Sequence, residues 1–347
     1  MMKILYAVQG TGNGHITRAI EIIPYLQQKG EVDILVSGIQ SDIDLPFDVK
    51  YRFKGLSFIF GKKGGVDFWK TFVKLNSIKL VKEIKKLDLK PYDLIISDFE
   101  PISCWAAIKA KKECIGLSNQ VATLHPLAPK PKKTDLIGKL VLQNYAPTSY
   151  NYGFHFKRLD GTIFTPIIRK KVRELKPTNE GHYTVYLPSY DDSQILKWLK
   201  KMPNTYWQVF SKNSKKEILF KNIRITPINT ELFLESMASA DGVLCNAGFG
   251  TASEALFLKK KLMVIPMKKQ LEQAYNAQML NEMGVAVIKK LSNKNIPKII
   301  KWLEDDSIVA VDYPDNTEEI ISLIVTNHAG NKKFNINYES ENYTFFQ

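Results

Sequence analysis

Short apolar runs alternate with amphipathic stretches along the first half of the chain. Continuous apolar runs of four to eight residues are typical of strands buried on both faces of a parallel sheet. The expected elements are, in chain order, a strand at Lys3–Val8, a helix from His15 to Gln28, strands at Val32–Ser37 and Tyr92–Ser97, a helix at Cys104–Lys111 and a strand at Cys114–Leu117. Strands that alternate with helices at this spacing predict βαβ units.

The same alternation starts again after the charged, polar segment Arg169–Gly181, which is expected to link two domains. Strands are expected at Tyr183–Leu187, Tyr206–Phe210, Ile223–Thr226, Gly242–Cys245 and Leu262–Pro266. Helices are expected at Ser193–Lys201, Thr230–Ser239, Gly250–Phe257 and Glu272–Met283. The pattern therefore predicts an α/β protein with two Rossmann-like domains.

Length and composition agree with this organisation. The chain has 347 residues, 44% of them hydrophobic and 24% charged, which suits a soluble protein of about two domains. No apolar run approaches the roughly 18 residues of a membrane span, and Met1–Val8 is too short for the core of a signal peptide. Cys104, Cys114 and Cys245 have spacings that suit neither a disulfide framework nor a zinc site. We expect a cytoplasmic protein.

The net charge of +14 is unevenly distributed. Eleven basic residues and three acidic ones lie between Arg52 and Lys90, an excess of eight positive charges. Aromatic residues are interleaved with lysines over Phe58–Lys90, as in helices that lie on an anionic membrane. The alternative is a helix that packs on the sheet with its lysines in solvent.

A glycine-rich turn, Gly10–His15, follows the first strand and opens the first helix. Glycines allow a tight turn and close approach of a ligand, and a helix N-terminus favours negative charge. The spacing is neither the G-x-G-x-x-G of dinucleotide binders nor a P-loop. His15 would face the crevice where open α/β sheets bind ligands. An ordinary turn with an incidental histidine is the alternative.

Two carboxylates follow the apolar strand Tyr92–Ser97. Asp98 and Glu100 lie at its carboxyl end, just before Pro101. A histidine is a suitable general base near neutral pH, and a carboxylate orients it and stabilises its protonated form. Asp98 is therefore a candidate partner of His15, while capping of the next helix is an alternative and compatible role.

The segment Cys245–Leu256 (CNAGFGTASEAL) forms a second glycine-rich turn into a helix. Its backbone N–H groups are placed to hold a diphosphate. Glu254 lies about one turn into the helix, where its carboxylate can accept both hydroxyls of a ribose. The alternative is an ordinary capped helix with an exposed glutamate. It would explain a single feature of this segment but not the glycines, the helix and Glu254 in this order.

The string NAGFGTASEAL, the strand that ends at Pro266, and EQAYNAQML together resemble the donor-binding segment of GT-B fold glycosyltransferases. The chain is similar to the lipid-linked muropeptide N-acetylglucosaminyltransferase and diacylglycerol glycosyltransferase group, and to UDP-glycosyltransferases. The turn before His15 and the strand before Asp98 match the same families. The resemblance spans residues 2–283.

The resemblance implies a role for individual residues. His15 would deprotonate the acceptor, and Asp98 would orient the imidazole of His15. Apart from the resemblance, Glu100 is the next candidate base if His15 does not act. The turn Gly12, Asn13 and Gly14 would face phosphate or acceptor. The implied donor contacts are Ser189 on phosphate, Ile228 beside the uracil, Gly248, Gly250 and Thr251 on the diphosphate, Glu254 on the ribose and Gln273 near the sugar. Two positions depart from the families: Glu272 replaces a second glutamine, and Asn246 replaces a histidine that contacts phosphate.

The resulting prediction is a GT-B fold with sheets facing across a cleft. Residues 1–165 would bind acceptor, 166–312 would bind donor, 313–328 would cross back as a helix (Thr317–Thr326), and 329–347 would form a tail. The resemblance implies inverting transfer from a nucleotide sugar, with UDP as the expected nucleotide, to a hydroxyl of a lipid or small molecule. It implies no cofactor and no essential metal. With a lipid acceptor, the enzyme could lie on the inner face of the membrane.

Two other functions are the alternatives: a nucleotide-sugar 2-epimerase of the same fold, and a non-catalytic nucleic-acid-binding protein. No nucleic-acid module is recognisable in the sequence.

Overall fold

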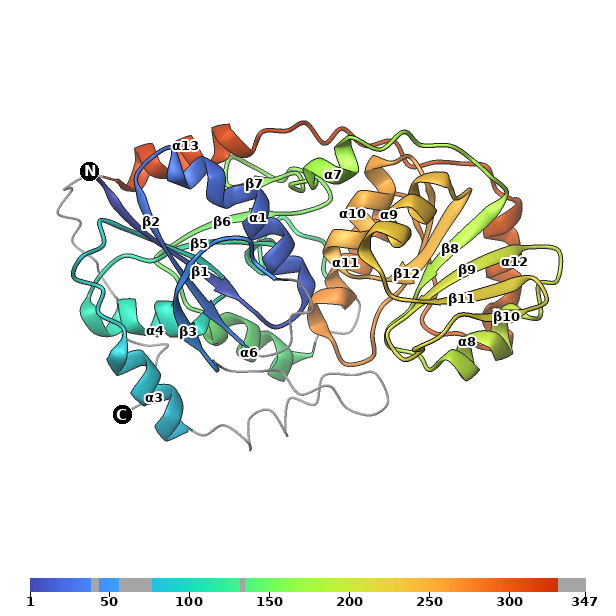
Figure 1. Ribbon diagram of the computed structural model, residues 1–347, viewed down its shortest axis with the longest axis horizontal. Helices are drawn as coiled ribbons and strands as arrows, with labels where there is room; N and C mark the ends of the chain where they lie inside the picture. Colours follow the sequence, from blue (N-terminus) through green and yellow to red (C-terminus); the bar gives the residue numbers. More distant parts are fainter. Residues whose placement is uncertain (39–43, 56–76, 132–134, 330–347) are drawn as a thin grey trace.

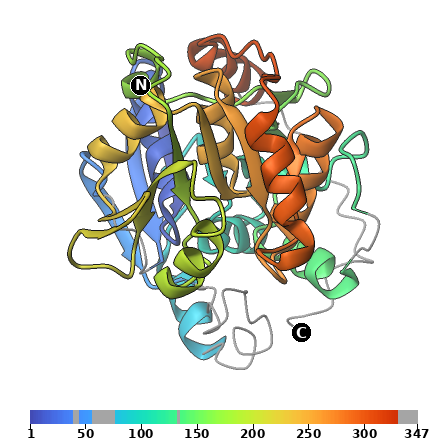
Figure 2. The same cartoon turned by 90° about the vertical axis from the view of Figure 1, so that its right-hand side faces the viewer.

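The computed structural model describes residues 1–38, 44–55, 77–131 and 135–329. Two α/β halves lie side by side along the long axis of the molecule (Figure 1). Each half is built on a seven-stranded sheet, and the view from the side of the C-terminal half shows helices on both faces of that half's sheet (Figure 2). The predicted α/β fold with two Rossmann-like sheets is confirmed.

The N-terminal sheet has the strand order β3-β2-β1-β4-β5-β6-β7, and all its strand pairs are parallel. Its strands are β1 (Lys3–Gln9), β2 (Glu31–Ser37), β3 (Val49–Phe53), β4 (Leu94–Asp98), β5 (Ile115–Ser118), β6 (Tyr150–Phe154) and β7 (Ile163–Phe164). The helices are α1 (Asn13–Gln27), α3 (Ser77–Lys86), α4 (Pro101–Ala110), α5 (Asn119–Thr123) and α6 (Leu136–Tyr145).

The C-terminal sheet has the order β10-β11-β9-β8-β12-β13-β14, in which only the edge pair β10–β11 is antiparallel. Its strands are β8 (His182–Tyr186), β9 (Tyr206–Ser211), β10 (Ile218–Phe220), β11 (Ile223–Pro227), β12 (Gly242–Asn246), β13 (Lys261–Ile265) and β14 (Ala286–Val287). The helices are α8 (Asp192–Leu199), α9 (Thr230–Ser239), α10 (Phe249–Phe257), α11 (Leu271–Glu282), the 3₁₀ turn η1 (Asn293–Asn295) and α12 (Ile296–Glu304).

The strand orders place a switch point in each half. From β1 the chain builds outward through β2 and β3, and then returns to place β4 on the other side of β1. The same reversal separates β9 and β12 on either side of β8. Open α/β sheets bind ligands outside the carboxyl ends of strands at such points. Both glycine-rich turns follow strands at these two positions.

Two segments connect the halves. The short helix α7 (Lys170–Arg173) lies in the crossover between β7 and β8, and the last helix, α13 (Thr317–His328), packs against α1. The hydroxyl of Tyr313, just before α13, donates to the backbone oxygen of Phe156 at 2.8 Å. The domain bounds predicted from the sequence stay a prediction, although the N-terminal sheet ends at Phe164 and the C-terminal sheet begins at His182.

The expected elements occur within a few residues of their predicted bounds. The structure adds elements that the apolar pattern did not predict, namely β3, β6, β7, β10, β14 and the helices α5, α6, α7 and α12. Most of Phe58–Lys90, including its aromatic residues, and the tail from residue 330 lie outside the described residues. Within the described part of the chain, no helix has the length and apolar character needed to cross a bilayer.

Candidate functional site

A histidine–aspartate pair lies at the carboxyl end of the N-terminal sheet. His15 is in the first turn of α1, and Asp98 is the last residue of β4, which pairs with β1 at Val8. His15 Nδ1 is 2.8 Å from Asp98 Oδ1, and both side chains are buried. Because an ionised carboxylate only accepts, we assign Nδ1–H as the donor to Asp98, which leaves the lone pair of the imidazole on Nε2. Arg18 Nη2, which only donates, lies 3.1 Å from the same Nδ1 and favours the opposite tautomer. The His15–Asp98 contact has the geometry of a general base held by a carboxylate.

Arg18, which the sequence analysis did not single out, completes this pair. It lies one helical turn after His15, and its Nε and Nη2 donate to the two oxygens of Asp98 at 2.9 and 2.5 Å. Burial alone would raise the pKa of the Asp98 carboxyl, but the charge of Arg18 and the hydrogen bonds from His15 and Arg18 outweigh burial, and the pKa is lowered. Asp98 is therefore an ionised partner for His15. The i, i+3 spacing of His15 and Arg18 was the available signal.

The backbone between the two predicted carboxylates is strained. Phe99 has a φ of 55°, in the left-handed region that costs a non-glycine residue of order 1–3 kcal/mol. Its ring lies 4.8 Å from the ring of Tyr145 and stacks at 6.4 Å, almost parallel, with the imidazole of His15. The turn directs Asp98 toward α1 and Glu100 toward α4.

Glu100 is the N-cap of α4. Its carboxylate accepts from the backbone N–H groups of Ile102 at 2.8 Å and Ser103 at 2.6 Å, and from the hydroxyl of Ser37 at 2.6 Å. The capping role that the sequence analysis considered for Asp98 belongs to Glu100. With its oxygens occupied by three donors, Glu100 is placed to hold the end of β4 in position.

The first glycine-rich turn needs its glycine. Gly12 precedes α1 with a φ of 91°, which an L side chain rarely adopts. Among the described residues, apart from the turn itself and the helix backbone, no atom lies within 4 Å of the Cβ position of Gly12 or Gly14. Asn13 begins the helix, and its backbone oxygen accepts from the Thr17 hydroxyl. The turn can approach a ligand closely with its backbone.

The second glycine-rich turn joins β12 to α10 at the switch point of the C-terminal sheet. Gly248 is the N-cap of α10, and Gly250 and Thr251 lie in its first turn, where N–H groups have no partner within the helix. Within the part of the chain that the structure describes, and apart from neighbouring residues and the helix backbone, no atom lies within 4 Å of the Cβ position of Gly250, and near Gly248 only Gln273 Nε2 does, at 3.9 Å. This helix N-terminus is arranged as an anion site.

The other predicted donor contacts come from the loop after β8, from α11 and from the residue after β11. The hydroxyl of Ser189 donates to Asn246 Oδ1 at 3.0 Å, so the predicted phosphate contact lies beside the residue that replaces the histidine of the families. Gln273 accepts from the backbone N–H of Met267 at 2.9 Å. Ile228 follows β11 as an exposed side chain. The predicted donor contacts therefore come from separate elements of the same half.

Glu254, the predicted ribose contact, is already paired. Arg169, which precedes α7 in the crossover, donates from Nε and Nη2 to the two carboxylate oxygens at 2.5 and 2.7 Å. The Glu254 side chain is 8% exposed and that of Arg169 is 18% exposed. A ribose would have to share this carboxylate with Arg169 or displace it. No sequence signal marked this pair, whose members are 85 residues apart.

The two halves meet beside the histidine. Glu272, at the start of α11, accepts from the side-chain amides of Asn119 at 2.8 Å and Gln120 at 3.0 Å, which begin α5. The Gln120 amide nitrogen is also 3.3 Å from His15 Nε2. A residue of the C-terminal half thus lies two hydrogen bonds from the candidate base.

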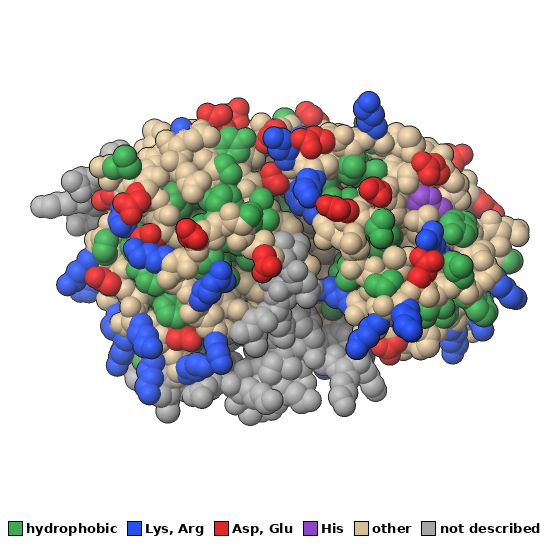
Figure 3. Space-filling model, in the orientation of Figure 1, with side chains coloured by type: hydrophobic (Ala, Val, Ile, Leu, Met, Phe, Trp, Pro, Cys, Tyr) green, Lys and Arg blue, Asp and Glu red, His purple; other side chains and the backbone are tan. Residues whose placement is uncertain are grey.

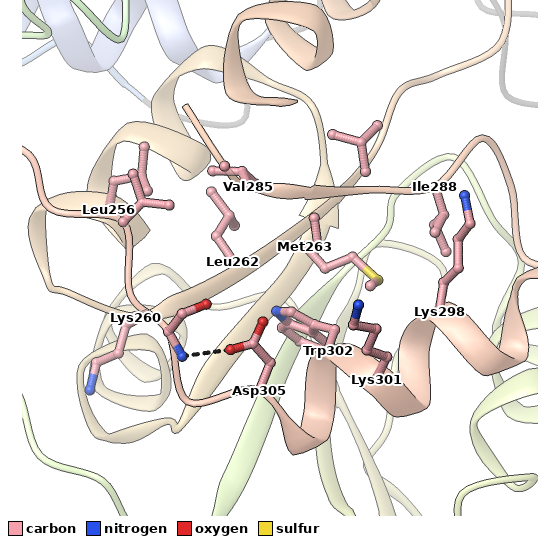
Figure 4. Close-up of a pocket in the computed structure, with 15 residues that line it drawn as sticks. Leu256, Lys260, Leu262, Met263, Val285, Ile288, Lys298, Lys301, Trp302 and Asp305 are labelled. Atoms are coloured by element: carbon pink, nitrogen blue, oxygen red, sulfur yellow. Dashed lines mark hydrogen bonds between the residues drawn. The ribbon is translucent and has the colours of Figure 1, made fainter. Parts of the chain in front are cut away.

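Two cavities differ in whether they are lined by candidate site residues or by residues that contact them. One, of about 220 Å³, lies between β13, β14 and α12 and is lined by Met263, Lys298 and Trp302 among others (Figure 4). It contains none of the candidate site residues. The other, of about 320 Å³, is lined by Phe99 and Gln120, which both contact His15, and by apolar side chains of α5 and α6. The second cavity is the one beside the histidine.

The basic segment is described only in part. Helix α3 carries Lys79, Lys82, Lys85 and Lys86, and Lys and Arg side chains gather over the part of the surface where Figure 1 places α3 (Figure 3). The aromatic residues expected to insert into a membrane lie outside the described residues. The membrane contact and its packed-helix alternative both stay predictions.

A family model described as glycosyl transferase family 1 matches residues 2–304. No curated protein sequence matches the chain. Among solved structures, MurG of Acinetobacter baumannii has 13% sequence identity and a TM-score of 0.58, covering 94% of this chain and 100% of its own. Arabidopsis thaliana UGT89C1 complexed with UDP has 13% identity and a TM-score of 0.59, covering 94% of each chain. Phytolacca americana UGT2, complexed with UDP-2-fluoro-glucose and pterostilbene, has 15% identity and a TM-score of 0.55, covering 94% of each chain.

Proposed function

The chain belongs to glycosyl transferase family 1, and from this premise we propose that it transfers a sugar, with inversion, from a nucleotide sugar to an acceptor hydroxyl. The observation that carries the proposal is the buried His15–Asp98 pair beside a glycine-rich turn at the carboxyl end of β1. The pair supplies a base, and the turn before α10 supplies an anion site for the leaving group.

The proposed reaction is a direct displacement. His15 Nε2 takes the proton of the acceptor hydroxyl while the acceptor oxygen attacks the anomeric carbon. The bond from that carbon to the diphosphate oxygen breaks on the opposite face, which inverts the configuration. The electron pair leaves with the diphosphate, and backbone N–H groups of Gly248–Thr251 and the N-terminus of α10 stabilise its charge. We expect no essential metal, so addition of a chelator should leave the rate unchanged.

We propose UDP as the donor nucleotide. The solved structures with UDP or a UDP-sugar bound support this choice, together with Ile228, which is exposed where the resemblance places the uracil. Ser189 follows β8, Glu254 lies in α10 and Gln273 lies in α11, and these side chains would contact phosphate, ribose and sugar in that order. Thermal shift with UDP-, GDP- and dTDP-sugars tests the proposal. UDP-sugars should raise the melting temperature most, and no shift with any of them would contradict it.

The acceptor is proposed to be lipid-linked or lipid-like. This rests on the excess of eight positive charges between Arg52 and Lys90, because each basic residue near an anionic leaflet contributes about 1 kcal/mol to membrane binding. The enzyme would then act from the cytoplasmic face of the membrane.

Incubation with the nucleotide sugar alone separates a glycosyltransferase from a 2-epimerase. A 2-epimerase would convert the sugar without an acceptor.

A further inference from the structure

Six side chains form a closed ring of hydrogen bonds that includes the candidate base. In order, the ring runs His15, Asp98, Arg18, Asn119, Glu272 and Gln120, and returns to His15. The link from Arg18 Nη1 to Asn119 Oδ1 is 3.0 Å, and the closing link from Gln120 Nε2 to His15 Nε2 is 3.3 Å. The ring therefore reaches both nitrogens of the imidazole.

Glu272 is the only member of the ring that belongs to the C-terminal half. It lies at the start of α11, whereas the other members come from α1, α5 and the end of β4. Asn119 and Gln120 are each 6% exposed, and Glu272 is half-buried. One carboxylate thus connects the donor-binding half to both sides of the His15–Asp98 pair.

The carboxylate fixes the orientation of the Gln120 amide. Glu272 can only accept, so Gln120 must direct its nitrogen toward Glu272, and the same nitrogen faces His15 Nε2. An amide N–H can pair only with the lone pair of Nε2, while Asp98 accepts from Nδ1–H on the other side. Among the described residues, Gln120 Oε1 has no hydrogen-bond partner, so the oxygen does not set this orientation.

We propose that Glu272 is a positioning residue that acts on His15 from across the domain boundary and, through Gln120, holds the lone pair of the base on Nε2. This inference rests on the proposed role of His15 as the base. It implies that the base is set in its working tautomer when the two halves are in contact. The acceptor hydroxyl then replaces the Gln120 amide at Nε2 and donates its own proton.

The tautomer of His15 in the ligand-free protein tests this directly. Long-range ¹H–¹⁵N NMR of the imidazoles at pH 8 distinguishes a protonated Nδ1 from a protonated Nε2, and His15→Ala identifies the signal among the five histidines. In Glu272→Gln the new amide must direct its NH₂ at Gln120 or Asn119. A turned Gln120 would present its oxygen to His15 and favour a proton on Nε2.

The expected result is one Nδ1–H tautomer in the wild type and a substantial Nε2–H population in Glu272→Gln. The matched control is Glu282→Gln at the other end of α11, where Glu282 is exposed and pairs with Gln278. Its spectrum should match the wild type. An unchanged His15 tautomer in folded Glu272→Gln would overturn the proposal. Since this readout needs no turnover, it remains decisive if the protein binds no nucleotide sugar.

Kinetics separate positioning from direct contact of Glu272 with the donor sugar. A misplaced base costs roughly 10- to 100-fold in turnover, and we expect this loss in kcat for both Glu272→Gln and Gln120→Met. UDP affinity should stay within about twofold of the wild type in both, since neither change touches the proposed UDP contacts. Because the two residues act through one link, the double variant should lose no more than either single variant. Additive losses would show that Glu272 acts by another route and would contradict the proposal.

Discussion

At the residue scale, the site depends on side chains whose roles are set by tertiary contacts. His15, Asp98, Glu254 and the glycines of the two turns were visible in the sequence because motif spacing marks them. Arg18 was not singled out, because its i, i+3 spacing from His15 does not by itself reveal the buried carboxylate with which it pairs. The positive φ of Phe99 could not be predicted either, because the surrounding structure has to impose a strained backbone on that residue.

Arg18 should be required for stability as well as for orienting Asp98. Arg18→Met leaves a buried carboxylate without its cation, which typically destabilises a protein by about 3–5 kcal/mol. Urea unfolding measures this, and Arg224→Met, which breaks the exposed Arg224–Glu217 pair, should cost less than about 1 kcal/mol. Equal effects of the two substitutions would contradict the role of Arg18.

The pH dependence of stability has a defined sign at Asp98. The folded-state pKa of Asp98 is lowered from 3.8, so its contribution to stability is present above pH 3.8 and is lost as the pH falls through the folded value. In Arg18→Met the pKa of Asp98 should rise, because burial is then opposed by fewer charges. The part of the stability that is lost on acidification through Asp98 should therefore be smaller than in the wild type, as measured by urea unfolding followed by circular dichroism between pH 2 and pH 6.

Glu254 should bind the donor ribose when Arg169 moves away from the carboxylate or when both groups bind the carboxylate together. Glu254→Ala is expected to weaken UDP binding by roughly 1.5–3 kcal/mol, the range for hydrogen bonds to charged groups. Calorimetry measures the UDP affinity of both Glu254→Ala and the control variant Glu217→Ala. The control removes an exposed glutamate that also pairs with an arginine, and its UDP affinity should match that of the wild type. Unchanged UDP affinity in folded Glu254→Ala would remove Glu254 from the donor site.

At the element scale, the sequence predicted the central strands and their following helices well. Leu94–Asp98 and Gly242–Asn246 are buried throughout, so their apolar runs were continuous and readable. The edge strands were missed: β10 is exposed along its length, and β7 and β14 have two residues each, too few to show a pattern. Helix α5 was missed because its five residues follow β5 directly and end before an apolar face can repeat.

The segment Phe58–Lys90 is predicted to bind an anionic membrane surface. Sedimentation with liposomes should show binding to anionic but not neutral vesicles, and the binding should weaken with salt because screening shortens the range of the attraction. Charge reversal at Lys62, Lys63 and Lys70 should reduce binding. Charge reversal at Lys215, Lys216 and Lys221 in the C-terminal half is the matched control and should not. Absence of binding to anionic vesicles at low salt would favour a soluble acceptor.

At the scale of the whole molecule, two carboxylates of the C-terminal half form hydrogen bonds with other parts of the chain. Glu254 is held by Arg169 of the crossover, and Glu272 is held by two amides of the N-terminal half. The sequence could show that there are two α/β halves, but contacts between residues 85 to 153 positions apart became visible only in the folded chain.

The measurement that tests the central claim most directly is slow donor turnover with water as the acceptor, followed by NMR. The donor is the nucleotide sugar that gives the largest thermal shift. Inverting transfer predicts that the anomer opposite to that of the donor appears first. It also predicts that His15→Ala lowers the rate roughly 10²–10⁴-fold while donor affinity stays near that of the wild type. Release of the retained anomer first, conversion of the donor to its 2-epimer, or full turnover by His15→Ala would contradict the account.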